Sequence, residues 1–230
     1  MPLSRHTRVP QLSAADLRVL AGCTLRVLRD SNRTLDIIRA EELSAQTQLK
    51  SLLRAGLFEL DDEARALFAD RPILAQTDLD ALRGKPASSL GGAFARFLDA
   101  HELDYALSAQ PTPFTRDPDA AWLLHRIRQS HDLWHVLVGL GTRAHEEVLI
   151  HAFSLGQTGL PSSILIAVLG GVKHLVFERR WRDLAGLWRA YGIGRRARPL
   201  LGVYWERHWD EPLTAIRARY GVVPISRAPS

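Results

Sequence analysis

The segment at 131–147, HDLWHVLVGLGTRAHEE, carries the side chains best suited to bind a metal ion. His131 and His135 are four residues apart, so on a helix that turns about 100° per residue both imidazoles face one side, with Asp132 at its edge. Glu147 lies twelve residues beyond His135, roughly 18 Å away along an unbroken helix. Two imidazoles and two carboxylates suit a divalent ion of the zinc or iron class, provided that the chain turns back between them.

Two glycines after the histidine pair supply such a turn. Gly139 and Gly141 can end the first helix, and Thr142 is a suitable N-cap for a second one. If the second helix folds back, Glu147 lies in its second turn, level with His135 across the hairpin. The sequence therefore predicts a helical hairpin with one metal site built from His131, Asp132, His135 and Glu147.

Three other interpretations compete with the metal hairpin. A chain with nine histidines can contain an H-x-x-x-H pair by chance. Gly139, Gly141 and Ala144 imitate the G-x-G-x-x-A fingerprint of dinucleotide-binding proteins, but the segment before them has a helical pattern and the region near 160 reads GLPSS, without the required acidic residue. Adjacent His131 and Asp132 would also suit a histidine-aspartate phosphohydrolase, whose other ligands come from well-separated helices.

The length and composition indicate one ordinary globular domain. No linker divides residues 1–230. The chain has 46% hydrophobic and 24% charged residues, which is the ordinary balance of a globular protein. We expect only the ends, 1–10 and 225–230, to be flexible. The net charge of +5 favours anionic partners, but no basic cluster is dense enough to predict nucleic-acid binding.

The sequence also carries signals about the compartment. Cys23 is the only cysteine, so no internal disulfide can form, and this is typical of a reducing interior. The start MPLSRHTRVP has no apolar signal region, which favours a cytoplasmic location. The longest apolar stretch, from Ile164 to Phe177, is interrupted by Lys173 and His174 and is shorter than the roughly 20 residues that a spanning helix needs.

Helical spacing of apolar residues runs through the whole chain, and no segment alternates like a strand, so the predicted class is all-α, a single-domain multi-helix bundle. In the central helix, the apolar stripe from Leu124 to Val138 includes both histidines and places them on the buried face, where unpaired polar groups are costly. The helices expected are 13–29, 33–42, 44–55, a short one between Asp61 and Pro72, 78–83, 90–101, 118–138, one to about 157, 162–177, 180–191, about 196–208, and 213–220.

Two of these segments suggest contact with lipid. The segment at 162–177, SSILIAVLGGVKHLVF, lacks a polar face and suits either a buried core helix, which we favour, or the wall of a lipid-sized pocket. The segment at 180–191 places Trp181, Leu184 and Trp188 on one face and arginines on the other. That pattern fits either a packed stripe under a solvated face or a surface that rests on a membrane.

The chain resembles the coenzyme Q (ubiquinone) biosynthesis protein four family, whose signature is HDxxH, eleven residues and then Glu. His131, Asp132, His135 and Glu147 match this signature with its spacing intact. Similar surroundings cover most of 70–224, whereas the first seventy residues match in helical character alone. The similar segments within 70–224 are RPIL at 71–74, FARFLDAHELD, RDPDAAWLLHRIRQSHD, AFSLGQTGLP and LLGVYWERHWDEPLTAIRARYGV. The segment RAYGIGRRARPL departs from the usual Pro-Trp opening of the family's basic stretch.

The resemblance implies an all-helical, membrane-peripheral enzyme that binds zinc, or alternatively iron or manganese, through the four motif residues. It implies a prenylated 4-hydroxybenzoate-derived substrate, held in an apolar tunnel, whose ring carbon one loses its carboxylate and gains a hydroxyl. Asp132 and Glu147 are then the expected catalytic residues, and the expected location is the inner face of the cytoplasmic membrane. A homodimer and contacts with other quinone-biosynthesis proteins are also expected.

A non-catalytic role is the alternative. In this interpretation the chain is a lipid-binding scaffold of a quinone-biosynthesis complex, and its metal only braces the helical hairpin. Four protein ligands would favour this role if they closed the coordination shell, because catalytic zinc usually keeps one position open.

Overall fold

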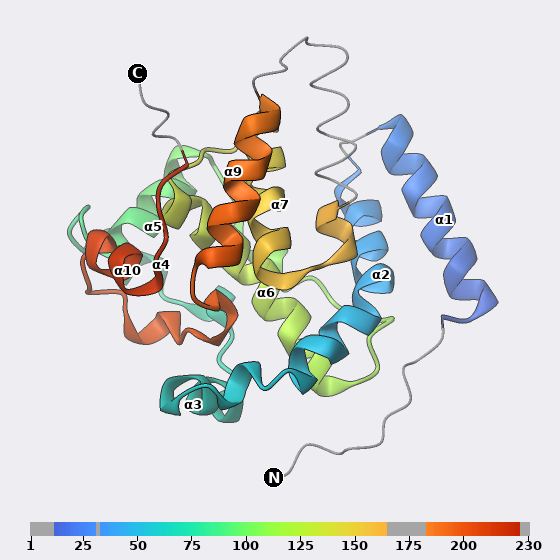
Figure 1. The fold of residues 1–230 in the computed structure, drawn as a ribbon, viewed down its shortest axis with the longest axis horizontal. Helices are drawn as coiled ribbons and strands as arrows, with labels where there is room; N and C mark the ends of the chain where they lie inside the picture. Colours follow the sequence, from blue (N-terminus) through green and yellow to red (C-terminus); the bar gives the residue numbers. More distant parts are fainter. Residues whose placement is uncertain (1–11, 31–32, 165–182, 226–230) are drawn as a thin grey trace.

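The computed structural model describes residues 12–30, 33–164 and 183–225, and within these ranges the chain is all-helical (Figure 1). The predicted fold class is therefore confirmed. The only extended pairing in the described ranges is an isolated antiparallel bridge between Ser89 and Pro212.

The elements follow one another with short connections. The α-helices are α1 (Ala14–Arg29), α2 (Thr34–Arg54), α3 (Asp62–Asp70), α4 (Leu79–Arg83), α5 (Leu90–Ala100), α6 (Pro118–Val138), α7 (Ala144–Thr158), α9 (Asp183–Arg196) and α10 (Leu213–Tyr220). Short 3₁₀ turns lie between them: η1 (Leu57–Glu59), η2 (Leu74–Gln76), η3 (Tyr105–Ala109), η5 (Leu200–Gly202) and η6 (Trp205–Arg207).

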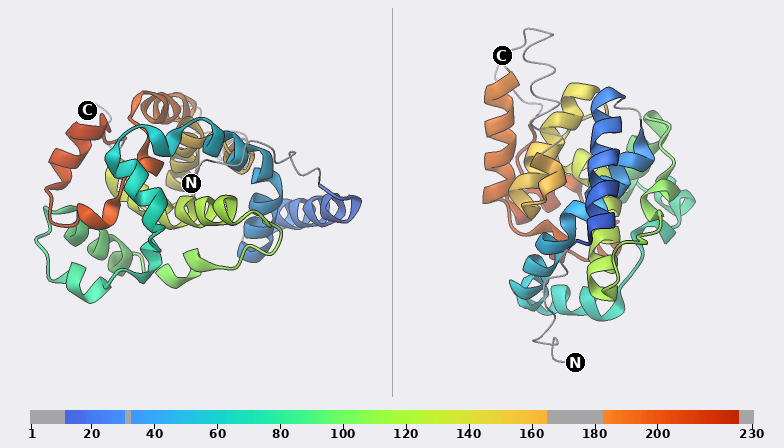
Figure 2. Two further views of the ribbon diagram at one scale, coloured as in Figure 1. Left: turned by 90° about the horizontal axis from the view of Figure 1, so that it is seen from below. Right: turned by 90° about the vertical axis from the view of Figure 1, so that its right-hand side faces the viewer.

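The first two helices form a pair at one edge of the molecule (Figures 1 and 2). α1 begins with the expected capping box, in which Ser13 Oγ accepts from the Asp16 amide and the Asp16 carboxylate accepts from the Ser13 amide. The prediction of separate helices at 33–42 and 44–55 was wrong, because α2 is continuous. The hydroxyl of Ser44 donates to the carbonyl of Glu41 within the helix and does not cap a new one.

The core is built around α6. The Asp117 carboxylate accepts from the amides of Asp119 and Ala120, and Pro118 occupies the first turn, as the sequence predicted. The helix buries apolar side chains along most of its length, among them Leu123, Leu124, Leu133, Trp134 and Leu137. Because α6 is enclosed on several sides, His135 lies fully inside the fold and His131 lies partly buried beside it.

α7 and α9 pack side by side at unusually close range (Figures 1 and 2). Two glycines make this approach possible. A Cβ atom at Gly194 would lie 2.2 Å from the carbonyl oxygen of Phe153, and one at Gly156 would lie 2.6 Å from that of Tyr191. The contact therefore requires both glycines, and it fixes the backbone of the second arm of the hairpin.

The predicted helix at about 196–208 was wrong. The chain leaves α9 at Arg196 and makes the two 3₁₀ turns η5 and η6. Side chains from distant helices accept hydrogen bonds from backbone amides that would otherwise donate within a helix. Gln157 accepts from the Leu200 amide, and Glu63 accepts from the Tyr204 amide. These long-range acceptors compete with the helical hydrogen bonds and favour turns.

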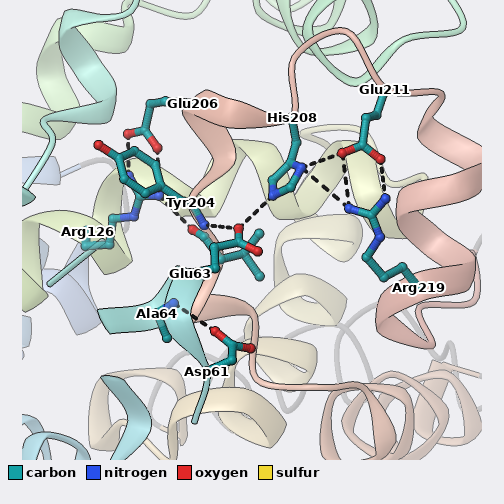
Figure 3. A network of polar contacts seen from close by, with 10 residues as sticks. Asp61, Glu63, Ala64, Arg126, Tyr204, Glu206, His208, Glu211 and Arg219 are labelled. Carbon is teal, nitrogen blue, oxygen red and sulfur yellow. Dashed lines mark hydrogen bonds and ion pairs between the residues drawn. The ribbon is translucent and has the colours of Figure 1, made fainter. Parts of the chain in front are cut away.

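A network of charged side chains fastens this turn region to the helices (Figure 3). His208 lies between the carboxylates of Glu63, at 2.6 Å, and Glu211, at 2.5 Å, and Glu211 also pairs with Arg219. Beside them, the fully buried guanidinium of Arg126 makes a bidentate pair with Glu206. Arg126 is on α6, so the C-terminal region is tied directly to the central helix.

Several predictions concern residues at or beyond the limits of the described ranges. Most of the apolar segment at 162–177, Trp181 and the expected flexible ends lie outside them. Ile225, which we had assigned to the flexible C-terminal end, is instead buried, and its amide donates to the Val138 carbonyl. Trp188 is 74% exposed, so it does not pack in a buried stripe. Among the described helices, none has the length and apolar character needed to cross a membrane.

Candidate metal centre

The hairpin between α6 and α7 forms where the sequence placed it. Gly139 ends α6 in the left-handed region, with φ 69°, and the Leu140 amide donates back to the His135 carbonyl. The prediction of Thr142 as N-cap was wrong, because α7 begins at Ala144. The Glu146 carboxylate accepts from the amides of Gly141, at 2.9 Å, and Arg143, at 3.2 Å, and so caps the turn in place of a threonine hydroxyl.

Three of the four motif side chains meet across this hairpin. His131, His135 and Glu147 each present one ligand atom, and these atoms lie within 4.8 Å of one another. Glu147 Oε1 is 3.5 Å from His135 Nε2, and Glu147 Oε2 is 3.9 Å from His131 Nε2. In the part of the chain that the structure describes, this is the only group of three or more such side chains with metal-binding geometry.

The unpaired ring nitrogens of this group fit a metal ion. His131 Nε2 and both ring nitrogens of His135 are buried and have no hydrogen-bond partner among the described residues. Buried polar atoms without partners cost free energy, so such atoms are usually satisfied by something the fold is built to hold. A divalent ion between the two Nε2 atoms and the Glu147 carboxylate would satisfy them.

Asp132 does not join the three-donor group. Its Oδ1 lies 3.3 Å from His131 Nδ1, and so it contacts the ring nitrogen that does not face the group. A carboxylate in this position accepts the Nδ1 proton and leaves Nε2 free to bind an ion. Direct ligation by Asp132 therefore stays a prediction, and the geometry fits a carboxylate that orients the imidazole.

The electrostatics keep Glu147 ready to bind a cation. Burial raises its pKa, but the contact with His135 Nε2, at 3.5 Å, and the charges of His131 and His135 outweigh this and lower the pKa to about 2. Burial lowers the pKa of His131, but the Asp132 hydrogen bond and the charge of Glu147 raise it above its ordinary value. Without metal, the Glu147 carboxylate is thus ionised and is stabilised by the nearby imidazoles.

His151 is a neighbour of this group that our sequence analysis did not consider. Its ring centroid is 5.4 Å from that of His131, and its buried Nδ1 has no hydrogen-bond partner among the described residues. Burial and then the positive charge of His131 lower its pKa to about 3. The spacing between Glu147 and His151, one helical turn, was the available signal.

An aromatic side chain from α5 closes the other side of the group. The Phe97 ring stacks on His135, with a centroid separation of 5.5 Å and an interplanar angle of 26°. Phe97 also contacts His101, whose Nδ1 lies 3.1 Å from the Thr142 hydroxyl in the turn. α5 therefore supports both the second histidine of the motif and the turn after it.

Comparison with known proteins agrees with the motif and the helical fold. The family model described as "Coenzyme Q (ubiquinone) biosynthesis protein Coq4" matches residues 6–226. This chain belongs to that family. The resemblance noted in the sequence is thus confirmed over nearly the whole chain, and the match includes residues 6–70, where the sequence agreed in helical character alone.

Individual relatives of the Coq4 family agree with this assignment. A mouse protein named as a mitochondrial COQ4 homolog is 36% identical over 171 residues, which are 71% of this chain but 62% of the mouse protein. The bovine homolog is 34% identical over 216 residues, 93% of this chain and 80% of that protein. The crystal structure of a candidate ubiquinone biosynthesis protein from Nostoc punctiforme superposes with a TM-score of 0.68 at 25% identity, covering 89% of this chain and 97% of that one.

The names of these relatives correct one expectation. The mouse and bovine proteins are both described as mitochondrial, which contradicts the cytoplasmic location that we expected. A single cysteine indicates a reducing interior, and more than one compartment provides that. The composition therefore could not distinguish between such compartments.

Proposed function

We propose that this Coq4-family protein is a metal-dependent enzyme of ubiquinone, or related prenylquinone, biosynthesis. Membership of the family supports the pathway. The observation that supports metal dependence is the group at the hairpin formed by His131, His135 and Glu147, in which the buried Nε2 atoms of both histidines have no hydrogen-bond partner among the described residues and lie beside an ionised carboxylate. Zinc is the expected ion, with iron or manganese as alternatives, because imidazole and carboxylate donors suit all three.

The proposed reaction takes place at ring carbon one of a prenylated 4-hydroxybenzoate-derived intermediate. The carboxylate leaves as carbon dioxide and a hydroxyl takes its place, which is a two-electron oxidation of the ring. With dioxygen as the acceptor, one substrate, one water and one dioxygen give the hydroxylated ring, carbon dioxide and hydrogen peroxide. A bound ion would supply Lewis acidity toward the substrate carboxylate or ring oxygen, and iron or manganese would add redox chemistry.

The protein residues prepare the site for this substrate. His131 and His135 offer Nε2 from one face of α6, and Glu147 offers its carboxylate from α7. Asp132 accepts from Nδ1 of His131 and so selects the tautomer that presents Nε2 to the ion. Phe97 covers His135 and helps to exclude water from that side.

The test is an assay of purified, metal-loaded protein with a carboxyl-labelled prenylated 4-hydroxybenzoate-type substrate and dioxygen. We expect labelled carbon dioxide and a ring hydroxylated at the same carbon. Asp132→Ala and Glu147→Gln should lose both products while still binding the lipid. Glu59→Gln removes an exposed carboxylate outside the group, and it should remain active.

Two outcomes would contradict the enzyme proposal. Wild-type protein that binds the lipid tightly but releases no carbon dioxide with zinc, iron or manganese would favour the lipid-binding scaffold. Full activity in Glu147→Gln would show that the hairpin group is not the reaction centre.

A further inference from the structure

His151 lies in the same interior region as the three donors of the candidate metal centre. It is on α7, one helical turn after Glu147, so both side chains point from the same face of that helix toward α6. Its ring contacts that of His131, and the charges of His131, His135 and Glu147 all act on it. His151 therefore faces the two histidines of α6 from the other arm of the hairpin, the arm that also carries Glu147.

The ring of His151 is available for a new bond. Its Nδ1 is buried and has no hydrogen-bond partner among the described residues, so turning the ring breaks no hydrogen bond at that atom. A buried imidazole nitrogen without a partner is costly, and coordination would remove this cost. His151 lies outside the set of donors that are within 4.8 Å of one another, so its side chain must rotate toward the ion to join them.

We propose that His151 supplies a third imidazole to the ion, so that the donor set is His131, His135, His151 and Glu147, with Asp132 orienting His131 from outside. This inference rests on the proposed metal dependence. It assigns a ligand that is absent from the HDxxH-and-Glu signature, and it removes Asp132 from the set of direct ligands.

The exchange of a carboxylate for an imidazole changes the charge of the site. A divalent ion bound by two carboxylates and neutral imidazoles has a formal charge of about zero, whereas one bound by Glu147 alone among acids keeps about +1. The positive charge attracts an anionic group, such as the ring carboxylate of the proposed substrate, and it strengthens the Lewis acid. The third imidazole thus favours binding and activation of an acid substrate.

Spectroscopy of the Cu²⁺-loaded protein, with any histidine tag removed, can count the imidazoles directly. One equivalent of Cu²⁺ is added to the metal-free protein, and electron spin-echo modulation from the remote ring nitrogens gives the number of bound imidazoles. We expect three in the wild type and in Asp132→Asn, and two in His151→Ala. Competition with a chromophoric chelator should show Zn²⁺ affinity lowered at least about tenfold in His151→Ala.

His145→Ala is the matched control, because it makes the same substitution on the same helix, six residues earlier and outside the donor group. It should keep three imidazoles and a Zn²⁺ affinity within about twofold of the wild type. His151→Asn provides a second variant at this position that keeps a polar side chain. Thermal melts of metal-free His151→Ala and His151→Asn establish that both variants fold.

The outcomes separate this inference from the proposed function. An unchanged imidazole count and an unchanged Zn²⁺ affinity in folded His151→Ala would overturn the role of His151 and leave the metal centre of His131, His135 and Glu147 intact. A count that drops in Asp132→Asn but not in His151→Ala would also overturn it. A wild-type protein that binds no metal would overturn both proposals.

Discussion

At the level of single residues, the two ring nitrogens of His131 have different roles: Nδ1 contacts Asp132, and Nε2 is free to bind an ion. The carboxylate lies 3.3 Å from Nδ1, and Nε2 is left unpaired beside Glu147. Adjacent residues on a helix point about 100° apart, so they can serve one ion directly only if both side chains bend toward it. Holding the imidazole from behind requires no such bend.

Asp132→Asn tests this division of roles. The amide can still contact Nδ1 but does not supply the negative charge that favours the required tautomer, so we expect Zn²⁺ affinity to fall by about 10- to 100-fold without loss of the site. Chelator competition measures the change. Complete loss of stoichiometric zinc at saturating concentration would instead identify Asp132 as a direct ligand.

Acid should destabilise the metal-free protein through the same group. The folded-state pKa of His151 is about 3, below its ordinary value of 6.5, so the unfolded state binds more protons between these values and stability falls as pH falls. The folded-state pKa of Glu147 is about 2, below its ordinary value of 4.5, so this carboxylate also lowers stability as pH falls, at lower pH than His151 does. His131, whose pKa is raised, acts oppositely, and its stabilisation is lost as pH rises above 6.5.

The measurement is the free energy of unfolding of the metal-free protein by urea between pH 6.5 and 4.5. His151→Ala should flatten the acid dependence by up to about 1.4 kcal/mol per pH unit relative to the wild type. Burial also lowers the pKa of His125, so the wild type and the variant must be compared directly. Parallel curves for the two proteins would rule out His151 as the source.

At the level of elements, the close contact of α7 and α9 fixes the arm that carries Glu147 and His151. A methyl group at Gly194 would collide with the backbone of Phe153, which cannot move without shifting α7. At Gly192, two residues away on α9, a Cβ atom would meet only the flexible end of Arg196, at 3.1 Å.

Gly194→Ala should therefore lower the free energy of unfolding by about 1–3 kcal/mol and weaken metal binding, because α7 shifts relative to α6. Gly192→Ala is the control and should be neutral or stabilising by up to about 1 kcal/mol, since alanine favours a helix. Denaturant unfolding and zinc titration measure both effects. Equal stability of the two variants would show that the contact is looser than described.

Elements with local signals could be predicted from sequence, and elements set by distant contacts could not. Asp117 with Pro118 and Ser13 with Asp16 mark helix starts within a few residues, and both appear in the structure. The helix expected at 196–208 is replaced by turns because Glu63 and Gln157 bind its amides from far along the chain.

The candidate site shows the same limit. The glycine turn and the helical period were enough to place Glu147 opposite His135. The contact between His151 and His131 does not follow from a known motif, because it depends on the relative rotation of two packed helices. Tertiary packing alone fixes that rotation.

At the level of the whole molecule, the net charge of +5 favours an anionic membrane as a partner, and an exposed aromatic residue suggests which surface would meet it. Trp188 on α9 is 74% exposed and contacts Tyr191, and such amphipathic rings favour the interface between lipid and water. We therefore propose that the surface around Trp188 on α9 meets the membrane. Trp181, the other tryptophan first assigned to this surface, lies outside the described residues.

Trp188→Glu should reduce co-sedimentation with vesicles containing anionic lipid by about tenfold, because it removes the ring and adds a repelled charge. Leu60→Glu makes a comparable change at another exposed apolar residue, 60% exposed on the N-terminal side of α3, and should bind as the wild type does. Equal binding by both variants would place the membrane contact elsewhere.

The central claim is that the hairpin of α6 and α7 holds one divalent ion between His131, His135 and Glu147, and metal analysis tests it most directly. Purified wild-type protein, reconstituted with Zn²⁺ and desalted, should contain about one ion per chain. Folded His135→Ala should contain almost none, and His125→Ala, which changes a histidine on the same helix outside the group, should retain it. Stoichiometric zinc in His135→Ala, or none in the wild type, would contradict the claim.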